Sequence, residues 1–266
     1  MQLSVSNLAW PVEETDWCLE QLAKYNIQGV ELAPLKVFES WKAITDESIQ
    51  LVKGKYSKLG LEISSFQAIT FGAMNLALLG GDEKVDNFLL HIEKVANLLS
   101  KLNGDNAVFG SPGLRKNSEY EQKDLIFLFK RIDTIFAKYK TNFVLETVPQ
   151  YYGCNLLNTI KKTDTFLNNM DLKNVSRHFD SGCQFLSGDL TEKSQYIDFL
   201  SKSKHVHISE VDLNTFDFPS TYNVEIASIV KEHYKGRWCV LEMSDKNYTR
   251  LSFLNSLCNF SNLFSN

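Results

Sequence analysis

The chain has 266 residues, of which 44% are hydrophobic and 23% are charged. These proportions are ordinary for a globular protein and exclude a disordered chain or a fibre. With 28 basic and 32 acidic side chains the formal net charge is −4, so overall charge does not favour nucleic acid or an anionic membrane as partner. We therefore expect a small-molecule ligand, with no nucleic acid and no membrane as partners.

The cysteines and the N-terminus indicate a cellular compartment. The five cysteines are scattered and contain no C-x-x-C pair, which is typical of reduced thiols in the cytosol. The first residues lack the pattern of a signal peptide, and no segment approaches the roughly 20 apolar residues needed to cross a bilayer. We expect a cytoplasmic protein.

Short apolar runs alternate with longer amphipathic stretches along the whole chain, which is typical of βαβ units and a parallel sheet. The predicted strands are residues 3–5, 29–32, 61–66, 107–109, 143–146, 175–180, 205–209 and 238–242. The predicted helices are residues 16–25, 47–59, 82–102, 124–139, 156–170 and 224–234. The unit between residues 180 and 205 has a less regular pattern.

Eight such units are most simply closed into one (β/α)8 TIM barrel that spans residues 1–266 as a single domain. A doubly wound open sheet is the alternative. A dinucleotide-binding open sheet carries G-x-G-x-x-G after its first strand, whereas residues 6–11 read Ser-Asn-Leu-Ala-Trp-Pro. This difference favours the barrel.

The active site of a barrel lies at the carboxyl ends of its strands. The last four predicted strands place these polar residues there: Glu146, Asp180, His207 and Glu242. Each carboxylate closes an apolar run, where a divalent ion would compensate its buried charge. Three carboxylates and one imidazole suit Mn²⁺, Mg²⁺ or Co²⁺, and Zn²⁺ stays possible. Alternatively, the acids are helix N-caps or loop residues, and His207 is a hydrogen-bonded histidine of the barrel interior. His178 and His205 lie two residues before Asp180 and His207, where a packing or supporting role is expected.

The spacing of these four residues, together with His-Val-His-Ile-Ser-Glu at residues 205–210, resembles the xylose isomerase-like TIM-barrel superfamily. Within it the chain is most similar to the sugar phosphate isomerase/epimerase group, which includes D-tagatose 3-epimerase and hydroxypyruvate isomerase. Residues 29–34 and 109–112 also match. The resemblance implies a metal-dependent sugar or sugar-phosphate isomerase or epimerase. Glu146 and Glu242 would bind the metal and transfer protons next to a carbonyl through a cis-enediolate.

The strands that do not carry the metal would form the substrate wall of the pocket. Lys36 and Arg115 are candidates for a phosphate or carboxylate of the substrate, and Gln67 for a hydroxyl. Alternatively, these side chains are ordinary solvated loop residues. Trp10, Phe38 and Trp41 are candidates to stack on a sugar ring or to pack inside the protein.

Two departures from the epimerase pattern keep other functions open. Cys183 stands where the epimerase branch has histidine, and Val-Asp-Leu-Asn-Thr-Phe at residues 211–216 replaces a polar, arginine-containing loop. The barrel could instead be a carbohydrate-binding or scaffold subunit that has lost catalysis, and Cys183 as a nucleophile is a minor option. An endonuclease IV-type phosphodiesterase needs more histidines and a basic face. The apolar run at residues 251–264 could close the barrel or contact another subunit in a homo-oligomer.

Overall fold

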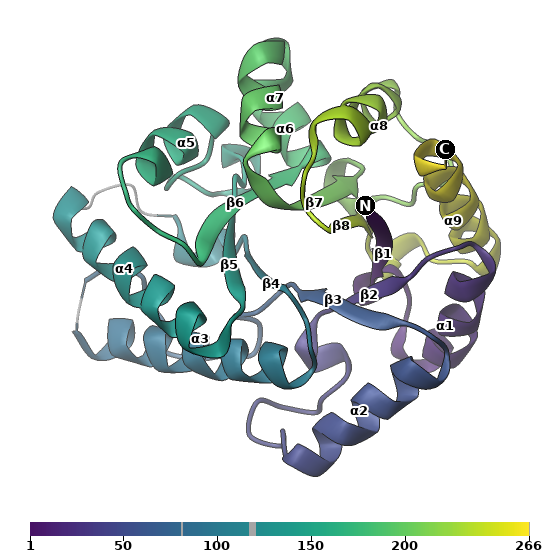
Figure 1. Ribbon diagram of the computed structural model, residues 1–266, viewed down its shortest axis with the longest axis horizontal. Coiled ribbons are helices and arrows are strands. Elements are labelled where there is room, and N and C mark those ends of the chain that lie inside the picture. Colours follow the sequence, from purple (N-terminus) through teal and green to yellow (C-terminus); the bar gives the residue numbers. More distant parts are fainter. Residues whose placement is uncertain (81, 117–120, 266) are drawn as a thin grey trace.

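The computed structural model describes residues 1–80, 82–116 and 121–265, and its core is a closed barrel of parallel strands in sequence order. Figure 1 looks down the barrel and shows the ring of strands surrounded by helices. Strand β1 (Gln2–Ser6) pairs with both β2 (Gly29–Leu32) and β8 (Trp238–Glu242), so the first and last strands close the sheet. The predicted (β/α)8 barrel is confirmed, and the open sheet is excluded.

The remaining strands are β3 (Glu62–Phe66), β4 (Asn106–Phe109), β5 (Asn142–Glu146), β6 (Val175–Asp180) and β7 (Ser203–Ser209). Each overlaps a predicted strand, and the largest difference is at β7, which begins two residues before the predicted range. Ser203 pairs with Arg177 of β6, and its hydroxyl donates to the carbonyl of Phe199. Hydrogen bonding rather than hydrophobicity extends this strand, so the apolar pattern did not reveal it.

The helices of the outer layer are α1 (Thr15–Lys24), α2 (Asp46–Lys58), α3 (Asp82–Lys101), α4 (Gln122–Tyr139), α5 (Ile160–Asn168), α6 (Ser181–Ser187), α7 (Lys193–Ser201), α8 (Thr221–His233) and α9 (Arg250–Phe264). The irregular unit after β6 consists of the two short helices α6 and α7. Within the described part of the chain, no helix combines the length and the hydrophobicity that a membrane span requires.

Helix α5 is shorter than predicted because two leucines before it continue the apolar spacing without being helical. Leu157 has a φ of 52°, which an α-helix does not allow. Thr159 then caps the helix, since its side chain accepts a hydrogen bond from the backbone N–H of Lys162. The helix therefore begins at Ile160.

Successive side chains of a strand point to opposite sides of the sheet, and the two sides of this barrel differ in polarity. Outward-pointing residues such as Phe143, Leu145 and Phe179 join the large apolar core between the strands and the helices. Buried polar residues of the strands include Ser4, Glu31, Asn106, His178 and His205. Because alternating strand residues point inward, the barrel interior is polar beneath its carboxyl edge, where charged side chains then find partners.

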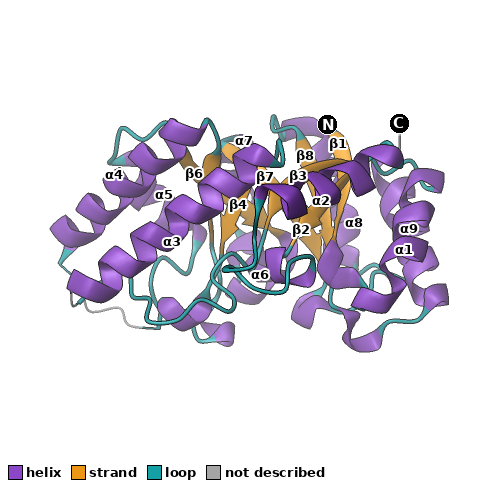
Figure 2. Ribbon diagram, turned by 90° about the horizontal axis from the view of Figure 1, so that it is seen from below, coloured by secondary structure: helices purple, strands orange, loops and turns teal. Residues whose placement is uncertain are grey.

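Different groups cover the two ends of the barrel. At the N-terminal end the ring of Trp238 is fully buried and lies against Gly29, where a Cβ atom would come within 2.6 Å of it. A bulky ring thus closes this end, and only glycine allows it to approach β2. At the opposite end, away from the N-terminus, the loops gather together with α6 (Figure 2).

The C-terminal run forms α9, which packs against α8. The ring of Phe253 lies 5.7 Å from that of Trp10 and 6.1 Å from that of Trp17. The structure places this run in the outer layer of its own barrel, and contact with another subunit stays a prediction.

Candidate active site

A cavity of about 490 Å³ lies at the carboxyl ends of the strands. Residues that follow β1, β3 and β4 form one wall, and residues of β5 to β8 and their loops form the other. Its acidic lining residues are Glu146, Asp180, Glu210, Asp212 and Glu242. The cavity also contains the imidazole of His207, so it combines a high density of carboxylates with one possible nitrogen ligand.

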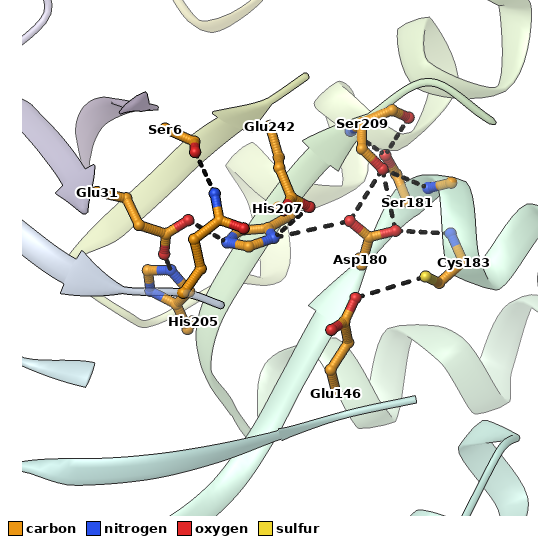
Figure 3. Close-up of polar contacts among 12 residues, drawn as sticks. Ser6, Glu31, Glu146, Asp180, Ser181, Cys183, His205, His207, Ser209 and Glu242 are labelled. Atoms are coloured by element: carbon orange, nitrogen blue, oxygen red, sulfur yellow. Dashed lines mark hydrogen bonds and ion pairs between the residues drawn. The ribbon is translucent and has the colours of Figure 1, made fainter. Parts of the chain in front are cut away.

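The structure brings the four predicted metal ligands to this cavity (Figure 3). Donor atoms of Asp180, His207 and Glu242 lie within 4.8 Å of one another, and Glu146 forms a second such group with Asp180 and His178. The Nδ1 atom of His207 lies 2.9 Å from Oε2 of Glu242 and 3.8 Å from Oδ2 of Asp180. These oxygen and nitrogen donors, all buried except the half-buried Glu146, fit a divalent cation.

Asp180 has two structural roles at once. Its Oδ1 accepts a hydrogen bond of 2.6 Å from the backbone N–H of Cys183 and so caps helix α6, as the N-cap alternative predicted. The Ser209 hydroxyl donates to both carboxylate oxygens, at 3.0 and 2.9 Å. These bonds fix the carboxylate so that Oδ2 faces His207. Capping therefore positions the group instead of withdrawing it from the site.

The position of the Glu146 carboxylate depends on Gly110 and on the thiol of Cys183. A Cβ atom on Gly110 would lie 2.2 Å from Oε2 of Glu146, so this carboxylate can keep its observed position only because residue 110 lacks a side chain. The Cys183 thiol donates to Oε1 at 3.5 Å. Burial raises the pKa of Glu146 to about 8, and repulsion by Asp180 and Glu242 acts in the same direction. Such a carboxyl group can take up and release a proton near neutral pH.

The other ionisable groups of the cavity are also strongly perturbed. Burial raises the pKa of Glu242, although the imidazole of His207 partly opposes the shift. Burial alone would lower the pKa of His207, but the carboxylates of Glu31 and Glu242 outweigh it and hold the pKa well above its ordinary value. A cation bound by these groups would therefore compete with protons for them.

Below the cavity lies the carboxylate of Glu31, a residue that was not predicted from the sequence as part of the site. Glu31 of β2 is fully buried, and it lies 2.9 Å from Nε2 of His205 and 2.9 Å from Nε2 of His207. Burial opposes its ionisation, yet the two imidazoles hold the pKa of Glu31 below its ordinary value. Its signal in the sequence is an acid inside the otherwise apolar run of residues 29–32. The ring of His178 packs against His207 with their centroids 4.2 Å apart.

Only one of the three predicted substrate-binding residues reaches the cavity. Gln67 lines it and donates to the hydroxyl of Ser6. Lys36 instead forms an ion pair of 2.8 Å with Asp245, donates to the carbonyl of Trp10, and borders a separate cavity of about 280 Å³. Lys36 belongs to the loop after β2 and is not a lining residue of the acidic cavity.

Arg115 is buried beneath the loops and is not a lining residue of the cavity. Its guanidinium donates to the backbone carbonyls of Gly110, Glu146, Leu156 and Leu157, over distances of 2.8 to 3.1 Å. Burial lowers its pKa. The side chain ties together the ends of β4 and β5 and the segment before α5, so its donors are already occupied.

The aromatic residues and the cysteine have local structural roles. Trp10 and Phe38 are buried, and the Trp41 ring packs against His91 with centroids 4.6 Å apart. None of these three rings is among the described residues that line the cavity. Burial holds the pKa of the Cys183 thiol well above its ordinary value, and the Asp180 and Glu146 carboxylates add to the shift. This disfavours the thiolate that a nucleophile requires.

Strained backbone surrounds the cavity. Positive φ angles occur at these non-glycine lining residues: Ala68, Ser111, Asp212 and Leu213. Their φ values lie between 41° and 58°, a conformation that most side chains disfavour. Strain of this kind accumulates where a particular loop shape is needed, as in a binding site.

Comparisons with known proteins agree with this architecture. The family model described as xylose isomerase-like TIM barrel matches residues 19–252. No curated protein matches the chain significantly in sequence.

Several solved structures share the fold. One is 3-keto-D-glucoside 4-epimerase from E. coli, with a TM-score of 0.75, 17% identity and coverage of 97% of both chains. D-Psicose 3-epimerase from Clostridium cellulolyticum H10 has a TM-score of 0.76 and 14% identity, covering 99% of this chain and 98% of that one. An L-ribulose 3-epimerase has a TM-score of 0.77 and 13% identity, covering 99% and 95%. At these identities the likeness establishes the fold.

Proposed function

Because the chain belongs to the xylose isomerase-like TIM barrel family, we propose that it is a divalent-metal-dependent sugar isomerase or epimerase. The observation that carries this proposal is the set of three carboxylates and one imidazole around one cavity, at the ends of the four consecutive strands β5 to β8. The epimerases among its structural neighbours support the same reaction class.

The metal site would consist of Glu146, Asp180, His207 and Glu242. Their donor set is rich in oxygen and suits Mn²⁺, Mg²⁺ or Co²⁺, with Zn²⁺ also compatible. Desolvation raises the pKa values of Glu146 and Glu242, and a cation bound between them would favour their ionised forms. When bound, the ion would polarise the substrate carbonyl and stabilise negative charge on its oxygen.

Two glutamates would transfer the proton. Glu146 closes β5 and Glu242 closes β8, so the two carboxylates enter the cavity from strands that β6 and β7 separate. One removes the proton next to the carbonyl, and the other returns it from the opposite side to give the epimer. Return of the proton to the neighbouring carbon gives aldose–ketose isomerisation instead. A carboxyl pKa near the working pH suits this exchange.

The charge of the cavity favours an uncharged sugar over a sugar phosphate. Among the described lining residues none is lysine or arginine, whereas five are acidic. The segments outside the description, 81, 117–120 and 266, contain no basic residue in the sequence. A phosphate would thus meet carboxylates without a protein cation to pair with it. The same acidity opposes a phosphodiester substrate.

Metal analysis followed by proton exchange tests the proposal. The purified protein, loaded with Mn²⁺ or Co²⁺, should incorporate deuterium from D₂O into an uncharged ketose or ketoglycoside, detected by mass spectrometry. Chelation should stop the exchange and re-addition of metal should restore it. Failure to bind any divalent ion, or an absence of exchange across a broad panel of uncharged ketoses, would overturn the assignment.

A further inference from the structure

Glu31 makes contacts that belong neither to the cavity wall nor to the apolar core. It lies on β2, across the barrel from β7, and its exposed fraction is 0%. Its carboxylate nevertheless reaches both histidines of β7, His205 and His207, as Figure 3 shows. A buried carboxylate is costly unless its contacts compensate its charge, so these two imidazoles are essential partners of the group.

A chain of hydrogen bonds fixes the tautomer of His205. The side-chain amide of Asn142 donates to Oδ1 of Asn106 at 3.2 Å, which turns the Asn106 amide nitrogen toward Nδ1 of His205 at 3.4 Å. Nδ1 of His205 is therefore an acceptor, and the ring carries its proton on Nε2. That proton is donated to Oε2 of Glu31 at 2.9 Å, and the Ser65 hydroxyl donates to the same oxygen at 2.7 Å.

With Oε2 occupied by these donors, the other oxygen of Glu31 faces His207. Oε1 lies 2.9 Å from Nε2 of His207, which places a negative charge at that nitrogen. The opposite nitrogen, Nδ1, points at Glu242 and Asp180. The contact between Oε1 and Nε2 is an ion pair without the geometry of a hydrogen bond, whereas Nδ1 forms a hydrogen bond of 2.9 Å with Oε2 of Glu242. A cation bound at Glu242 and Asp180 would take the place of the proton on Nδ1. The negative charge of Glu31 would then keep the remaining ring proton on Nε2, which is the arrangement of a histidine ligand supported from behind by an acid.

We propose that Glu31 is a positioning residue whose negative charge keeps a proton on Nε2 of His207 and thereby presents Nδ1 to a divalent ion bound by Asp180 and Glu242. This inference rests on the proposed function, because it assumes a metal at those carboxylates. Glu31 itself lies behind the imidazole and acts through it. The network from Asn142 through Asn106, His205 and Glu31 to His207 thus connects the barrel interior with the metal site.

The test compares Glu31→Gln with Glu62→Gln in titrations with Co²⁺. The Glu31→Gln substitution keeps the size of the side chain but removes its charge. Glu62 is a matched control because it lies on the adjacent strand β3, where its carboxylate is half exposed and pairs with Arg237. Calorimetry and the visible spectrum of bound Co²⁺ report the affinity and the ligand set, and thermal melting checks the fold.

We expect Glu31→Gln to weaken Co²⁺ binding by about 10- to 100-fold, the range typical of a lost supporting contact to a ligand. The Nε2–H signals of His205 and His207, observed by ¹⁵N NMR, should also shift or disappear. Glu62→Gln should bind Co²⁺ like the wild-type protein. Glu31→Asp, which keeps the charge, should recover part of the affinity.

Two results would overturn this role while leaving the proposed function intact. Glu31→Gln could bind Co²⁺ as tightly as the wild type, in which case Glu31 only stabilises the core. The wild type could bind two ions and Glu31→Gln only one, in which case Glu31 is itself a ligand. Absence of Co²⁺ binding by the wild-type protein would instead overturn the proposed function, and this inference with it.

Discussion

The two walls of the cavity differ in charge. Described lining residues that follow β1, β3 and β4, such as Leu8, Gln67 and Gly110, contain no ionisable group. The wall of β5 to β8 contains the carboxylates and the imidazole. One wall can therefore bind a cation and move protons, whereas the other can only shape the pocket and bond to hydroxyl groups.

Two basic residues lie near the neutral wall, but their charged groups bind other partners. Lys36 pairs with Asp245, and the guanidinium of Arg115 is surrounded by backbone carbonyls. Arg115 even donates to the carbonyl of Glu146 and so supports the charged wall from outside the cavity. The difference in charge between the two walls therefore depends on the contacts of Lys36 and Arg115 as well as on the composition of the loops.

Removing a single negative charge from the charged wall should have the largest effect. Glu146→Gln and Glu242→Gln should each reduce deuterium exchange into the substrate by about 10²- to 10⁴-fold, because an amide cannot act as the base. Glu225→Gln on the exposed surface of α8 is the matched control and should leave exchange unchanged. Retained exchange in a folded Glu146 or Glu242 variant would remove that residue from the proton-transfer step.

The second-largest effect is expected from a substitution on the neutral wall that displaces a carboxylate of the charged wall. The added methyl of Gly110→Ala would lie 2.2 Å from Oε2 of Glu146 and must displace the carboxylate. Exchange should fall by about 10²-fold, as expected for a reacting group displaced by an ångström. Gly113→Ala, where a Cβ meets nothing within 4 Å, is the control. Equal rates in the two variants would contradict the close fit of Glu146 against β4.

The affinity for metal should depend on pH. Glu146 in the metal-free protein has its pKa raised to about 8, and the pKa of His207 is also raised, so metal binding must displace protons. Affinity should therefore increase by about tenfold per pH unit for each proton released, up to pH about 8. Calorimetry in buffers of different ionisation enthalpy measures this release. A pH-independent affinity between about pH 6 and about pH 8 would contradict the protonated pocket.

The same shifts predict the stability of the metal-free protein. The folded pKa of Glu146 lies above its ordinary value, so its protonated form contributes stability at low pH that is lost as pH rises through about 8. His207, whose pKa is also raised, acts in the same direction. The melting temperature of the metal-free protein should therefore fall as pH rises through about 8, and a bound cation should reduce this fall.

The smallest effect is expected at Lys36. Lys36→Met removes a partly exposed ion pair, for which a loss below about 1 kcal/mol of stability is typical. Exchange should stay within about twofold of the wild type because the side chain does not line the cavity. A large loss of exchange with unchanged stability would return Lys36 to substrate binding.

Much of the fold could be predicted from the sequence, because the apolar periodicity that defines each strand and helix is local. The four residues at the ends of β5 to β8 were also predictable, since parallel strands bring their carboxyl ends to one edge. Where periodicity and backbone disagreed, as at Leu157, the predicted start of α5 was wrong.

Side-chain partners depend on contacts between distant segments and were not predictable in this way. Arg115 follows a strand end like a substrate ligand, yet the carbonyls of Leu156 and Leu157 occupy its donors. Glu31 looked like an ordinary acid in a strand, and only the closed barrel places it against His205 and His207.

The most direct test of the account is a paired exchange measurement with one ketose and its phosphate ester. Deuterium incorporation from D₂O would be followed with the metal-loaded and the chelator-treated protein. We predict exchange into the uncharged ketose only when metal is present, and at least about tenfold slower exchange into the phosphate ester. Exchange that persists after the metal is removed, or that favours the phosphate ester, would contradict the account.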